Sequence, residues 1–393
     1  MNILFVVKQF PNIGGVEVIT LMLAKQFISD GHKVYVITLL PKSMDSVVYE
    51  IPKEIEIIEL ATPVWCSANK KKLKDIIRNN KIDVIVNQWA LHPEIAYICN
   101  VARKETECQL ISVLHGAPDT TKMIIEQTEK VTKSKNIISK SFNQLKLKIY
   151  HFITKLSIKY VYRISNHYVL LSKGFIPKLV EYANLNSTKK LCAIGNAISI
   201  SSEGYKYDFD NKKKQILYVG RMDPYNKRVN RIVEAWEQVY KEYSDWSLEL
   251  VGEGIQLPAL KQYVHEKNIQ RVNFHGFQKE QPRKFYEDAS ILLLTSDLEG
   301  FGLVIIEAMQ FGVVPIVYGS YVAVYDIIDN EKNGFITSMP YDRNQTIKCI
   351  RKLIDNNILR HNMAVSAIEK SKEFSIERIC GHWYSLFENK TNN

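Results

Sequence analysis

The chain of 393 residues carries 52 lysine and arginine residues against 42 aspartate and glutamate residues, a formal net charge of +10. This length exceeds the ~250–300 residues that a single core usually reaches and therefore predicts two domains. The six cysteines are scattered without a C-x-x-C pair, so neither a disulfide framework nor a zinc site is indicated. The first apolar run is too short for a signal peptide, and none approaches the ~18 residues of a membrane span. We therefore expect a cytoplasmic protein that is soluble or bound to a membrane surface.

Strands and helices alternate along the chain, which predicts α/β domains with parallel sheets. In the first half the predicted strands are 2–7, 33–39, 55–59, 82–86, 109–114, 167–171 and 191–194, and the predicted helices are 16–29, 70–78 and 93–103. The second half supplies strands at 215–219, 247–251, 272–274, 291–295 and 313–317, with a helix at 227–240.

We therefore predict two Rossmann-like domains, an N-terminal one over 1–198 and a C-terminal one over 215–372. The polar stretch 199–214 is the predicted linker, and a last helix within 373–393 is expected to pack back on the first domain. Two such domains facing each other would leave a ligand cleft between them.

The strongest candidate site begins at Glu299, a few residues after a predicted buried strand and before a helix. Gly300 and Gly302 allow the backbone to approach a ligand closely. The helix that starts near Leu303 offers free N–H groups and a positive dipole end to an anion. Glu307 lies about two turns into that helix.

Two carboxylates beside a turn suited to phosphate fit a ligand that has hydroxyls next to its phosphates, such as a sugar nucleotide. Glu299 stands at the carboxyl end of a strand, where open α/β sheets bind ligands. The alternative is structural, with Glu299 as a helix cap and Glu307 on a solvated face.

Gly220, Arg221 and Lys227 bracket the first turn of the second domain. Two permanent cations at a helix mouth would hold a diphosphate and stabilise its charge as a leaving group, although two unrelated surface cations are the other reading. Gly14 and Gly15 form the equivalent turn of the first domain, where a glycine pair alone is a weak phosphate signal.

His115 follows a predicted strand and precedes a glycine, which places it at the ligand edge of the first domain. Asp208 and Asp210 resemble a metal-binding D-x-D, but they lie in the polar linker with no strand before them. We interpret them as a solvated loop and predict no metal and no cofactor.

From Lys130 to Val180 there is no aspartate or glutamate, whereas eleven lysine and arginine residues fall in that window. This window accounts for the whole positive surplus and indicates an anionic partner. Apolar residues recur three and four positions apart from Ile138 to Ile164, which predicts an amphipathic helix. One flank of this helix carries the bases Lys148, Lys155, Lys159 and Arg163.

An ordinary half-buried helix with a solvated edge would explain this spacing. The complete absence of acids favours contact with an anionic membrane surface. Tyrosines interleaved with the bases make nucleic acid a rival partner, but nothing in the chain matches a nucleic-acid module.

The second half resembles the retaining GT-B glycosyltransferases of family four. The resemblance rests on E-G-F-G-L-V-x-x-E-A-M from Glu299, on G-R-x5-K from Gly220, and on V-G-x-G, F-x-G and N-G motifs at 251–254, 274–276 and 333–334. It is dense from about residue 215 to 336 and thin in the first half. The chain departs from the family at Ser320-Tyr321, where a glycine pair is frequent, and at Asp326, where glutamate is usual.

This resemblance implies two Rossmann-like domains around a central cleft and a metal-independent transfer with retained anomeric configuration. It implies that Glu299 contacts the donor sugar, that Glu307 holds the ribose, and that His115 lies near the sugar on the acceptor side. The implied catalytic residues are Glu299, His115, Arg221 and Lys227. The implied nucleotide-sugar contacts are Gly14, Gly15, Gly220, Arg221, Lys227, Phe277, Glu299, Phe301, Gly302, Leu303 and Glu307.

We therefore expect a peripheral enzyme on the inner face of the plasma membrane that moves a hexose or N-acetylhexosamine to a lipid-linked glycan or oligosaccharide of a surface polysaccharide. A UDP-sugar is the expected donor, with GDP-mannose next. The rivals are a sugar-nucleotide 2-epimerase of the same fold and a nucleic-acid-binding protein that uses the basic window.

Overall fold

The computed structural model describes residues 1–12, 14–40, 50–278 and 282–389 and divides into two compact units. The first unit is Met1–Gly195 with Ile379–Asn393, and the second is Asn196–Arg378. The predicted linker, residues 199–214, falls within the second unit.

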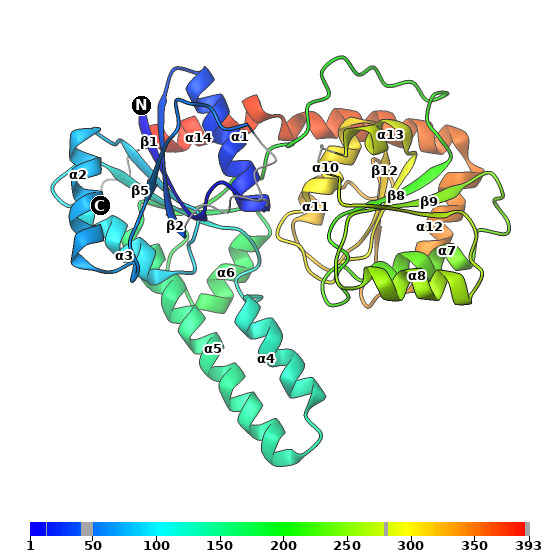
Figure 1. Cartoon of the computed structure of the whole chain (residues 1–393), viewed down its shortest axis with the longest axis horizontal. Coiled ribbons are helices and arrows are strands. Elements are labelled where there is room, and N and C mark those ends of the chain that lie inside the picture. Colours follow the sequence, from blue (N-terminus) through cyan, green and yellow to red (C-terminus); the bar gives the residue numbers. More distant parts are fainter. Residues whose placement is uncertain (13, 41–49, 279–281, 390–393) are drawn as a thin grey trace. The chain divides into compact units, whose positions relative to one another are not determined.

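The first unit contains a seven-stranded parallel sheet in the order β3-β2-β1-β4-β5-β6-β7 (Figure 1). Its central strands β4 and β5 are buried at every residue, as expected for continuous apolar runs in a parallel sheet. The strands are β1 (Asn2–Gln9), β2 (Lys33–Leu40), β3 (Glu56–Glu59), β4 (Val84–Asn87), β5 (Gln109–Leu114), β6 (His167–Leu170) and β7 (Leu191–Ala193). Each lies within a few residues of a predicted strand, so these predictions are confirmed.

The helices of the first unit are α1 (Gly15–Ser29), α2 (Ser67–Asn79), α3 (Pro93–Ala102), α4 (Lys122–Lys133), α5 (Ile137–Ile164), α6 (Phe175–Ala183) and α14 (Ile376–Glu388). The last helix packs on α1, where the Phe27 ring lies 5.8 Å from Phe387 and 5.4 Å from Tyr384. The Gln109 amide donates a 2.7 Å hydrogen bond to the Phe387 carbonyl. From Ile379 onward the C-terminal helix is therefore part of the first unit, as the sequence predicted.

Between β5 and β6 the chain leaves the sheet as a helical hairpin of α4 and α5 (Figure 1). The predicted amphipathic helix coincides with α5. Helix α4 was not predicted, although Thr121 caps it by accepting from the Ile124 amide at 3.3 Å. Among the described residues, no helix is long and apolar enough to cross a membrane.

The second unit contains a six-stranded parallel sheet in the order β10-β9-β8-β11-β12-β13. Its strands are β8 (Gln215–Val219), β9 (Ser247–Val251), β10 (Val272–Gly276), β11 (Ile291–Leu294), β12 (Val314–Tyr318) and β13 (Phe335–Thr337). Its helices are α7 (Val229–Glu237), α8 (Leu257–Glu266), α9 (Arg283–Asp288), α10 (Leu303–Gln310), α11 (Val324–Ile327), α12 (Arg343–Asp355) and α13 (Asn357–Ser371), followed by the 3-10 turn η1 (Lys372–Phe374).

The structure changes one predicted helix boundary and leaves one predicted turn only partly described. The helix predicted over 227–240 begins only at Val229, because Arg228 has φ 52 and a left-handed residue cannot continue a right-handed helix. This places Lys227 on the turn before the helix. The predicted turn 9–15 includes residue 13, which lies outside the described residues.

In both sheets the strand order reverses once, between β1 and β4 in the first unit and between β8 and β11 in the second. Open α/β sheets bind ligands beyond the carboxyl ends of the strands at this reversal. The fold thus indicates one candidate site in each unit.

Candidate functional site

In the second unit, backbone hydrogen bonds join the turns that follow four neighbouring strands. The turn after β8 is tied to the turn after β9 by Met222 N to Glu253 O at 2.7 Å, and to the turn after β11 by Asp297 N to Asn226 O at 2.7 Å. The end of β9 is tied to β10 by Gly252 N to Gly276 O at 2.8 Å. These bonds form a continuous backbone floor at the strand reversal.

Glycine is required at two points of this floor. Gly252 has φ 130, and a Cβ there would lie 2.0 Å from the Gly220 carbonyl oxygen. Gly302 caps α10 with φ 99, and a Cβ there would lie 2.7 Å from the Tyr321 hydroxyl. A side chain at either position would clash with these neighbours, so glycine is needed for this packing at the end of the strands.

Lys227 and Glu299 are brought together on this floor. The Lys227 ammonium lies 2.5 Å from a Glu299 carboxylate oxygen, and the two side chains are only 21% and 11% exposed. Since an ammonium has three donors, Lys227 can hold Glu299 and a ligand phosphate together. The predicted phosphate cation and the predicted sugar carboxylate are therefore one charged pair.

The other predicted residues of the second unit surround this pair less closely. Arg221 follows Gly220, its side chain is 69% exposed, and it pairs with Asp223 at 3.2 Å. Phe277 is exposed after β10, and its amide donates to the Glu253 carboxylate at 3.3 Å. Phe301 is buried against Phe374, so its backbone is the part that remains for a ligand.

Glu307 lies on α10 with 6% of its surface exposed. One carboxylate oxygen accepts from the Ser199 hydroxyl and the other from Tyr286 at 2.9 Å. Burial raises the pKa of Glu307. The structural alternative for the two glutamates is wrong on both counts, because Glu307 is not solvated and the N-cap of α10 is Gly302, with no side-chain cap.

Two hydroxyl groups at the carboxyl ends of neighbouring strands are buried without a hydrogen-bond partner among the described residues: Ser296 after β11 and Tyr321 after β12. Tyr321 is 5% exposed, and burial together with the Glu299 carboxylate raises its pKa. An unpaired buried hydroxyl is costly, so a polar ligand group would be a favourable partner. Only the departure from the family's glycine pair drew attention to Tyr321 in the sequence.

Sequence reasoning missed one charged cluster at the same edge. Asp297, two residues before Glu299, accepts from Arg228 at 2.6 Å and from Arg231 at 2.5 Å. Arg231 also donates to the Thr295 carbonyl at 3.0 Å. The cluster fixes the turn after β11 to α7, and an acid directly after a predicted strand was the available signal.

In the first unit, His115 lies in a pocket of about 180 Å³ at the carboxyl ends of β4 and β5. Its Nε2 lies 2.5 Å from the Gln88 amide oxygen, which can only accept, so Nε2 carries the proton and Nδ1 is free to accept. Burial lowers the pKa of His115 to about 4. Trp89 also lines the pocket, and its indole N–H is buried without a partner among the described residues.

Gly14 and Gly15 stand where α1 begins, at the reversal of the first sheet. The Glu17 carboxylate folds over Gly14, where a Cβ would lie 2.2 Å from Glu17 Oε2. Burial raises the pKa of Glu17. An anion that approaches this helix end would thus meet a carboxylate.

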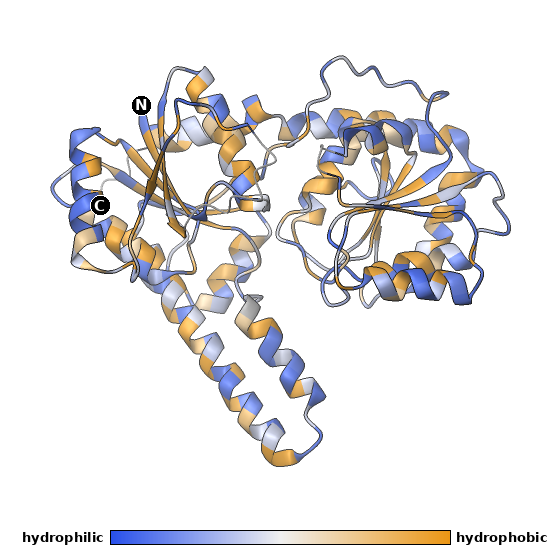
Figure 2. Ribbon diagram, viewed as in Figure 1, coloured by the Kyte–Doolittle hydropathy of each residue, from blue (hydrophilic) through white to orange (hydrophobic). Residues whose placement is uncertain are grey.

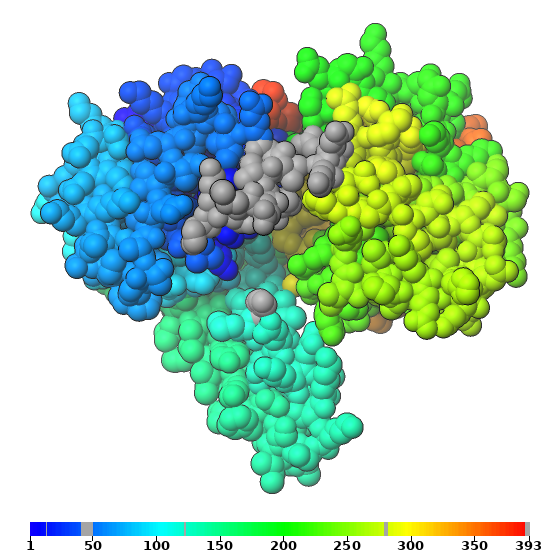
Figure 3. Space-filling view, viewed as in Figure 1, coloured from blue at the N-terminus to red at the C-terminus, as the bar shows by residue number. Residues whose placement is uncertain are grey.

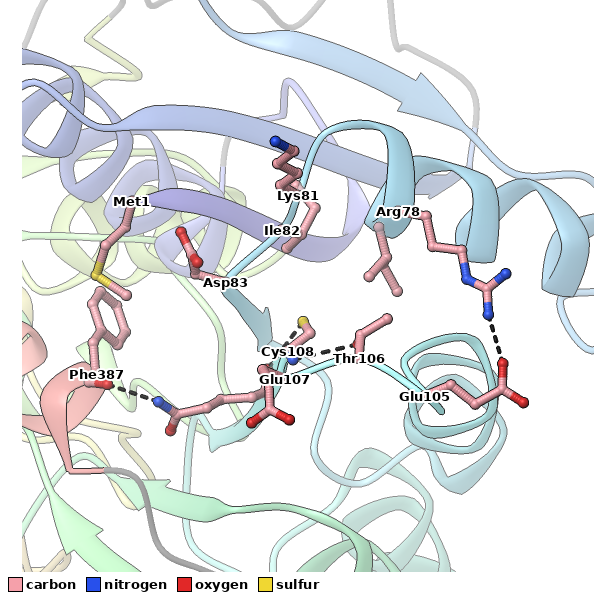
Figure 4. A pocket seen from close by; sticks show the side chains of 12 residues that line it. Met1, Arg78, Lys81, Ile82, Asp83, Glu105, Thr106, Glu107, Cys108 and Phe387 are labelled. Carbon is pink, nitrogen blue, oxygen red and sulfur yellow. Dashed lines mark hydrogen bonds and ion pairs between the residues drawn. The ribbon is translucent and has the colours of Figure 1, made fainter.

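A larger pocket of about 390 Å³ lies at the opposite, amino edge of the first sheet (Figure 4). Two of its polar side chains are engaged within the fold, since Arg78 pairs with Glu105 at 2.6 Å and the Gln109 amide nitrogen bonds to the Phe387 carbonyl, whereas the buried Gln109 oxygen has no partner among the described residues. Because ligand sites of open α/β sheets lie at the carboxyl edge, we do not assign this pocket to the candidate site.

Asp208 is part of a local loop, where it accepts from the Asp210 amide at 3.0 Å and from Asn211 at 2.7 Å. This confirms the interpretation of the D-x-D as a loop. Within residues 1–12, 14–40, 50–278 and 282–389, no group of three or more histidine, cysteine or acidic side chains is arranged to hold a metal ion.

Family models match both parts of the chain. Residues 13–201 match the model "Glycosyltransferase Family 4", and residues 202–370 match "Glycosyl transferases group 1". The chain belongs to the group 1 glycosyltransferases of GT-B fold.

Curated relatives of this glycosyltransferase are distant. An uncharacterized glycosyltransferase of Haemophilus influenzae is 29% identical over 51% of the chain and 55% of the relative. The N-acetyl-alpha-D-glucosaminyl L-malate synthase of Bacillus anthracis is 24% identical over 96% of the chain and 94% of the relative. The chain spans about half the length of the first relatives that it matches. Other matches are named for amylovoran biosynthesis, for poly(ribitol-phosphate) and lipopolysaccharide glycosylation, and for a PP-undecaprenol-linked glycan.

Among solved structures, a Staphylococcus aureus TarM variant in complex with Fondaparinux, alpha-GlcNAc-glycerol and UDP aligns with a TM-score of 0.73. It is 14% identical, and the alignment covers 99% of this chain and 100% of that one. At this identity the likeness confirms the fold, two Rossmann-like domains, that the sequence predicted.

Proposed function

We propose that this glycosyltransferase moves a hexose or N-acetylhexosamine from a UDP-sugar to a lipid-linked glycan of a bacterial surface polysaccharide, with retention and without a metal ion. The observation that carries the proposal is the Lys227–Glu299 pair at the mouth of α10. The names of the relatives agree with a glycan acceptor, and the UDP in the TarM complex agrees with the donor.

The second unit supplies the groups that a diphosphate sugar needs. Lys227 places a positive charge at the turn that leads into α10, and the N-terminal end of that helix has no side-chain cap, so both would stabilise the charge that develops on a leaving diphosphate. Glu299, oriented by Lys227, would accept hydrogen bonds from sugar hydroxyls. Glu307 keeps unused acceptor capacity beside its two bonds and would take the ribose hydroxyls.

The first unit supplies a place for the acceptor. The pocket at His115 combines the Trp89 ring with neutral polar groups, which suits a sugar that stacks and donates hydroxyl hydrogens. His115 is neutral at pH 7 because its pKa is about 4, so it would position the acceptor through Nδ1. The proton of the attacking hydroxyl would pass to the leaving phosphate.

A lipid-linked acceptor stays at the membrane, so we place the enzyme at the inner membrane surface. The four predicted bases support this location: Lys148, Lys155, Lys159 and Arg163 are all exposed on α5.

Two rivals are separated by simple assays. Incubation with UDP-GlcNAc alone would produce an epimer if the enzyme were a 2-epimerase. Electrophoretic retardation of DNA or RNA at physiological salt would persist only for a specific nucleic-acid binder, because non-specific phosphate contacts weaken steeply with salt.

The proposal is tested by exchanging each glutamate for its amide. Glu299→Gln should lower kcat about 10²–10³-fold, as for loss of a transition-state partner, with UDP affinity near normal. Glu307→Gln should instead weaken UDP binding. Initial rates and UDP titration calorimetry measure both, with Glu242→Gln, on a surface pair with Arg351, as the matched control.

Added EDTA should leave the wild-type rate unchanged. Equal, mild effects from both glutamate variants would assign them to structure, and activity that falls with EDTA and returns with Mn²⁺ would contradict the metal-free mechanism.

A further inference from the structure

Helix α5 packs with a mixed stripe of polar and apolar residues inward, and its buried residues are Thr154, Ser157, Ile158 and Val161. The residues that face its neighbours are Ser139, Asn143, Leu147, Tyr150, Thr154, Ser157 and Val161, spaced three and four apart. Asn143 accepts from Gln127 of α4 at 3.0 Å and donates to Ser134 at 3.0 Å. Polar contacts therefore hold the hairpin closed and fix which face of α5 turns outward.

The apolar stripe of α5 faces outward. Its residues are Ile138, Phe142, Leu145, Ile149, Phe152 and Leu156, which are 84%, 57%, 57%, 45%, 62% and 50% exposed. Apolar segments recur along α5 to the tip of the hairpin, where Ile137 is also 84% exposed (Figure 2). An ordinary amphipathic helix buries this stripe, so the half-buried alternative from the sequence is wrong for this part of α5.

The hairpin is well placed to present this stripe. It stands out from the rest of the first unit in the space-filling view (Figure 3). The exposed apolar row runs from residue 138 to 156, a helical length of roughly 27 Å at 1.5 Å per residue. Such a contiguous apolar surface marks an interaction site.

The charged residues beside the exposed apolar row of α5 indicate what kind of surface binds it. Lys148, Lys155 and Lys159 flank it on one side and are exposed, and no acid lies anywhere on α5. Helix α4 carries two acids, Glu126 and Glu129, and Glu129 pairs with Lys133 at 3.2 Å. The face of α5 is thus apolar along its centre and basic along its edge.

A second copy of the chain fits this face poorly. The 4-3-4-3-4 spacing is that of a coiled-coil seam, but the positions beside the seam include Lys146, Lys148 and Lys155. Two copies would bring these like charges together without a compensating acid. An anionic surface would attract them.

We infer that α5 is a membrane-docking helix that lies along an anionic bilayer with the 138–156 row in the headgroup–acyl boundary and its lysines on the phosphates. Basic amphipathic helices bind membranes in this way, through buried apolar area together with attraction to anionic lipid. The inference deepens the proposed membrane location and does not depend on the transfer reaction, so vesicle binding and catalysis can fail separately.

The hairpin is joined to the acceptor pocket. The Ser157 hydroxyl donates to the Leu91 carbonyl at 2.8 Å, and Leu91 lines the pocket of His115. Thr120, also in the pocket wall, leads directly into α4. Docking of α5 would therefore hold this pocket beside the bilayer, where a lipid-linked glycan is anchored.

Co-sedimentation with vesicles tests the inference, using phosphatidylglycerol-containing vesicles and pure phosphatidylcholine vesicles. We expect the wild type to bind the former and not the latter. Phe142→Ser with Ile149→Ser and Phe152→Ser should lower the partition coefficient at least tenfold. Lys148→Glu with Lys155→Glu and Lys159→Glu should lower it about a hundredfold at low salt.

The matched control is Ile255→Ser with Ile358→Ser, which removes apolar side chains that are 74% and 76% exposed in the second unit and should not change binding. In Phe152→Trp, brominated lipid should quench the new tryptophan in anionic vesicles. Circular dichroism checks that every variant folds. Unchanged binding of the serine variant would overturn the inference, as would a wild-type dimer that this variant dissociates into monomers.

Discussion

At the scale of single residues, two buried tyrosines of the second unit differ in the hydrogen bonding of their hydroxyls. Tyr218 donates to the Arg221 carbonyl at 2.9 Å, whereas the Tyr321 hydroxyl has no partner among the described residues. Both lie near Glu299, which helps to raise the pKa of each. The hydroxyl of Tyr218 therefore has a hydrogen-bond partner within the fold, whereas the hydroxyl of Tyr321 is available to a ligand.

Removing these hydroxyls should have opposite effects on the unliganded protein. Tyr321→Phe relieves an unsatisfied group and should raise the free energy of unfolding by about 1 kcal/mol, whereas Tyr218→Phe should lower it by a similar amount. Donor affinity should fall in Tyr321→Phe if the hydroxyl meets the ligand. Urea unfolding and UDP-sugar titration measure both; a destabilised Tyr321→Phe protein would show that the hydroxyl has a structural partner.

His115 predicts a pH dependence of stability. Its pKa is about 4 in the folded chain against 6.5 for the free side chain, so the unfolded chain binds the proton more readily between these values. Stability is therefore lost as the pH falls from about 6.5 toward 4. Between pH 7 and pH 5 the loss due to His115 should be on the order of 2 kcal/mol.

Urea unfolding of the wild type and of His115→Gln at both pH values measures this contribution. The variant should lose less stability between pH 7 and pH 5. Parallel losses in the two proteins would contradict the lowered pKa of this half-buried histidine.

Individual site residues could be predicted from the sequence where they belong to a motif or follow a predicted strand. Glu299 could be placed because an apolar run of strand length precedes its turn, and Glu307 because it falls in the helix that follows. The expected two turns into that helix were wrong, since α10 begins at Leu303 and Glu307 lies only about one turn along it. The Lys227–Glu299 contact joins residues far apart in the chain and depends on the left-handed Arg228, which no local pattern indicates. The missing partner of Tyr321 depends on packing and could not be predicted either.

At the scale of elements, α5 shows what periodicity does and does not determine. The spacing of apolar residues predicted a helix from Ile138 to Ile164, and the structure has Ile137–Ile164. Periodicity shows that one face is apolar but not which face is buried. The opposite face is held inward by the polar contacts of Asn143 and Ser157 to α4 and to the Leu91 carbonyl, together with the burial of Ile158 and Val161.

Helix α4 illustrates a different limit. Its inward face carries Ile124 and Gln127 among polar residues, so it has little apolar periodicity of its own. Its partner is α5, and the helix is stable in that context, as short helices usually are. The element could be identified only from its Thr121 cap.

At the scale of the whole molecule, two units with the same strand reversal carry different chemical groups. The second unit has cations, carboxylates and an open helix mouth, and the first has a neutral pocket attached to the α4–α5 hairpin. The presence of two α/β units could be predicted from the sequence, because predicted strands and helices alternate in both halves of the chain. The boundary was harder to predict, because residues 199–214 are polar and yet contribute Ser199 to the Glu307 site of the second unit.

Because the donor site and the hairpin lie in different units, we expect hairpin variants to lose transfer to a membrane-bound acceptor and to keep the other activities. Phe142→Ser with Ile149→Ser and Phe152→Ser should keep donor hydrolysis by water and transfer to a water-soluble acceptor within about twofold, because Lys227, Glu299 and Glu307 lie in the second unit. Transfer to a lipid-linked acceptor in anionic vesicles should fall at least tenfold, since binding to the bilayer raises the local concentration of this acceptor. Glu299→Gln should lower all three rates together. The measurement is kcat/KM for each variant with the soluble acceptor and with the membrane-bound acceptor. An equal decrease of kcat/KM with both acceptors would show that the hairpin acts through the structure of the first unit and not through the bilayer.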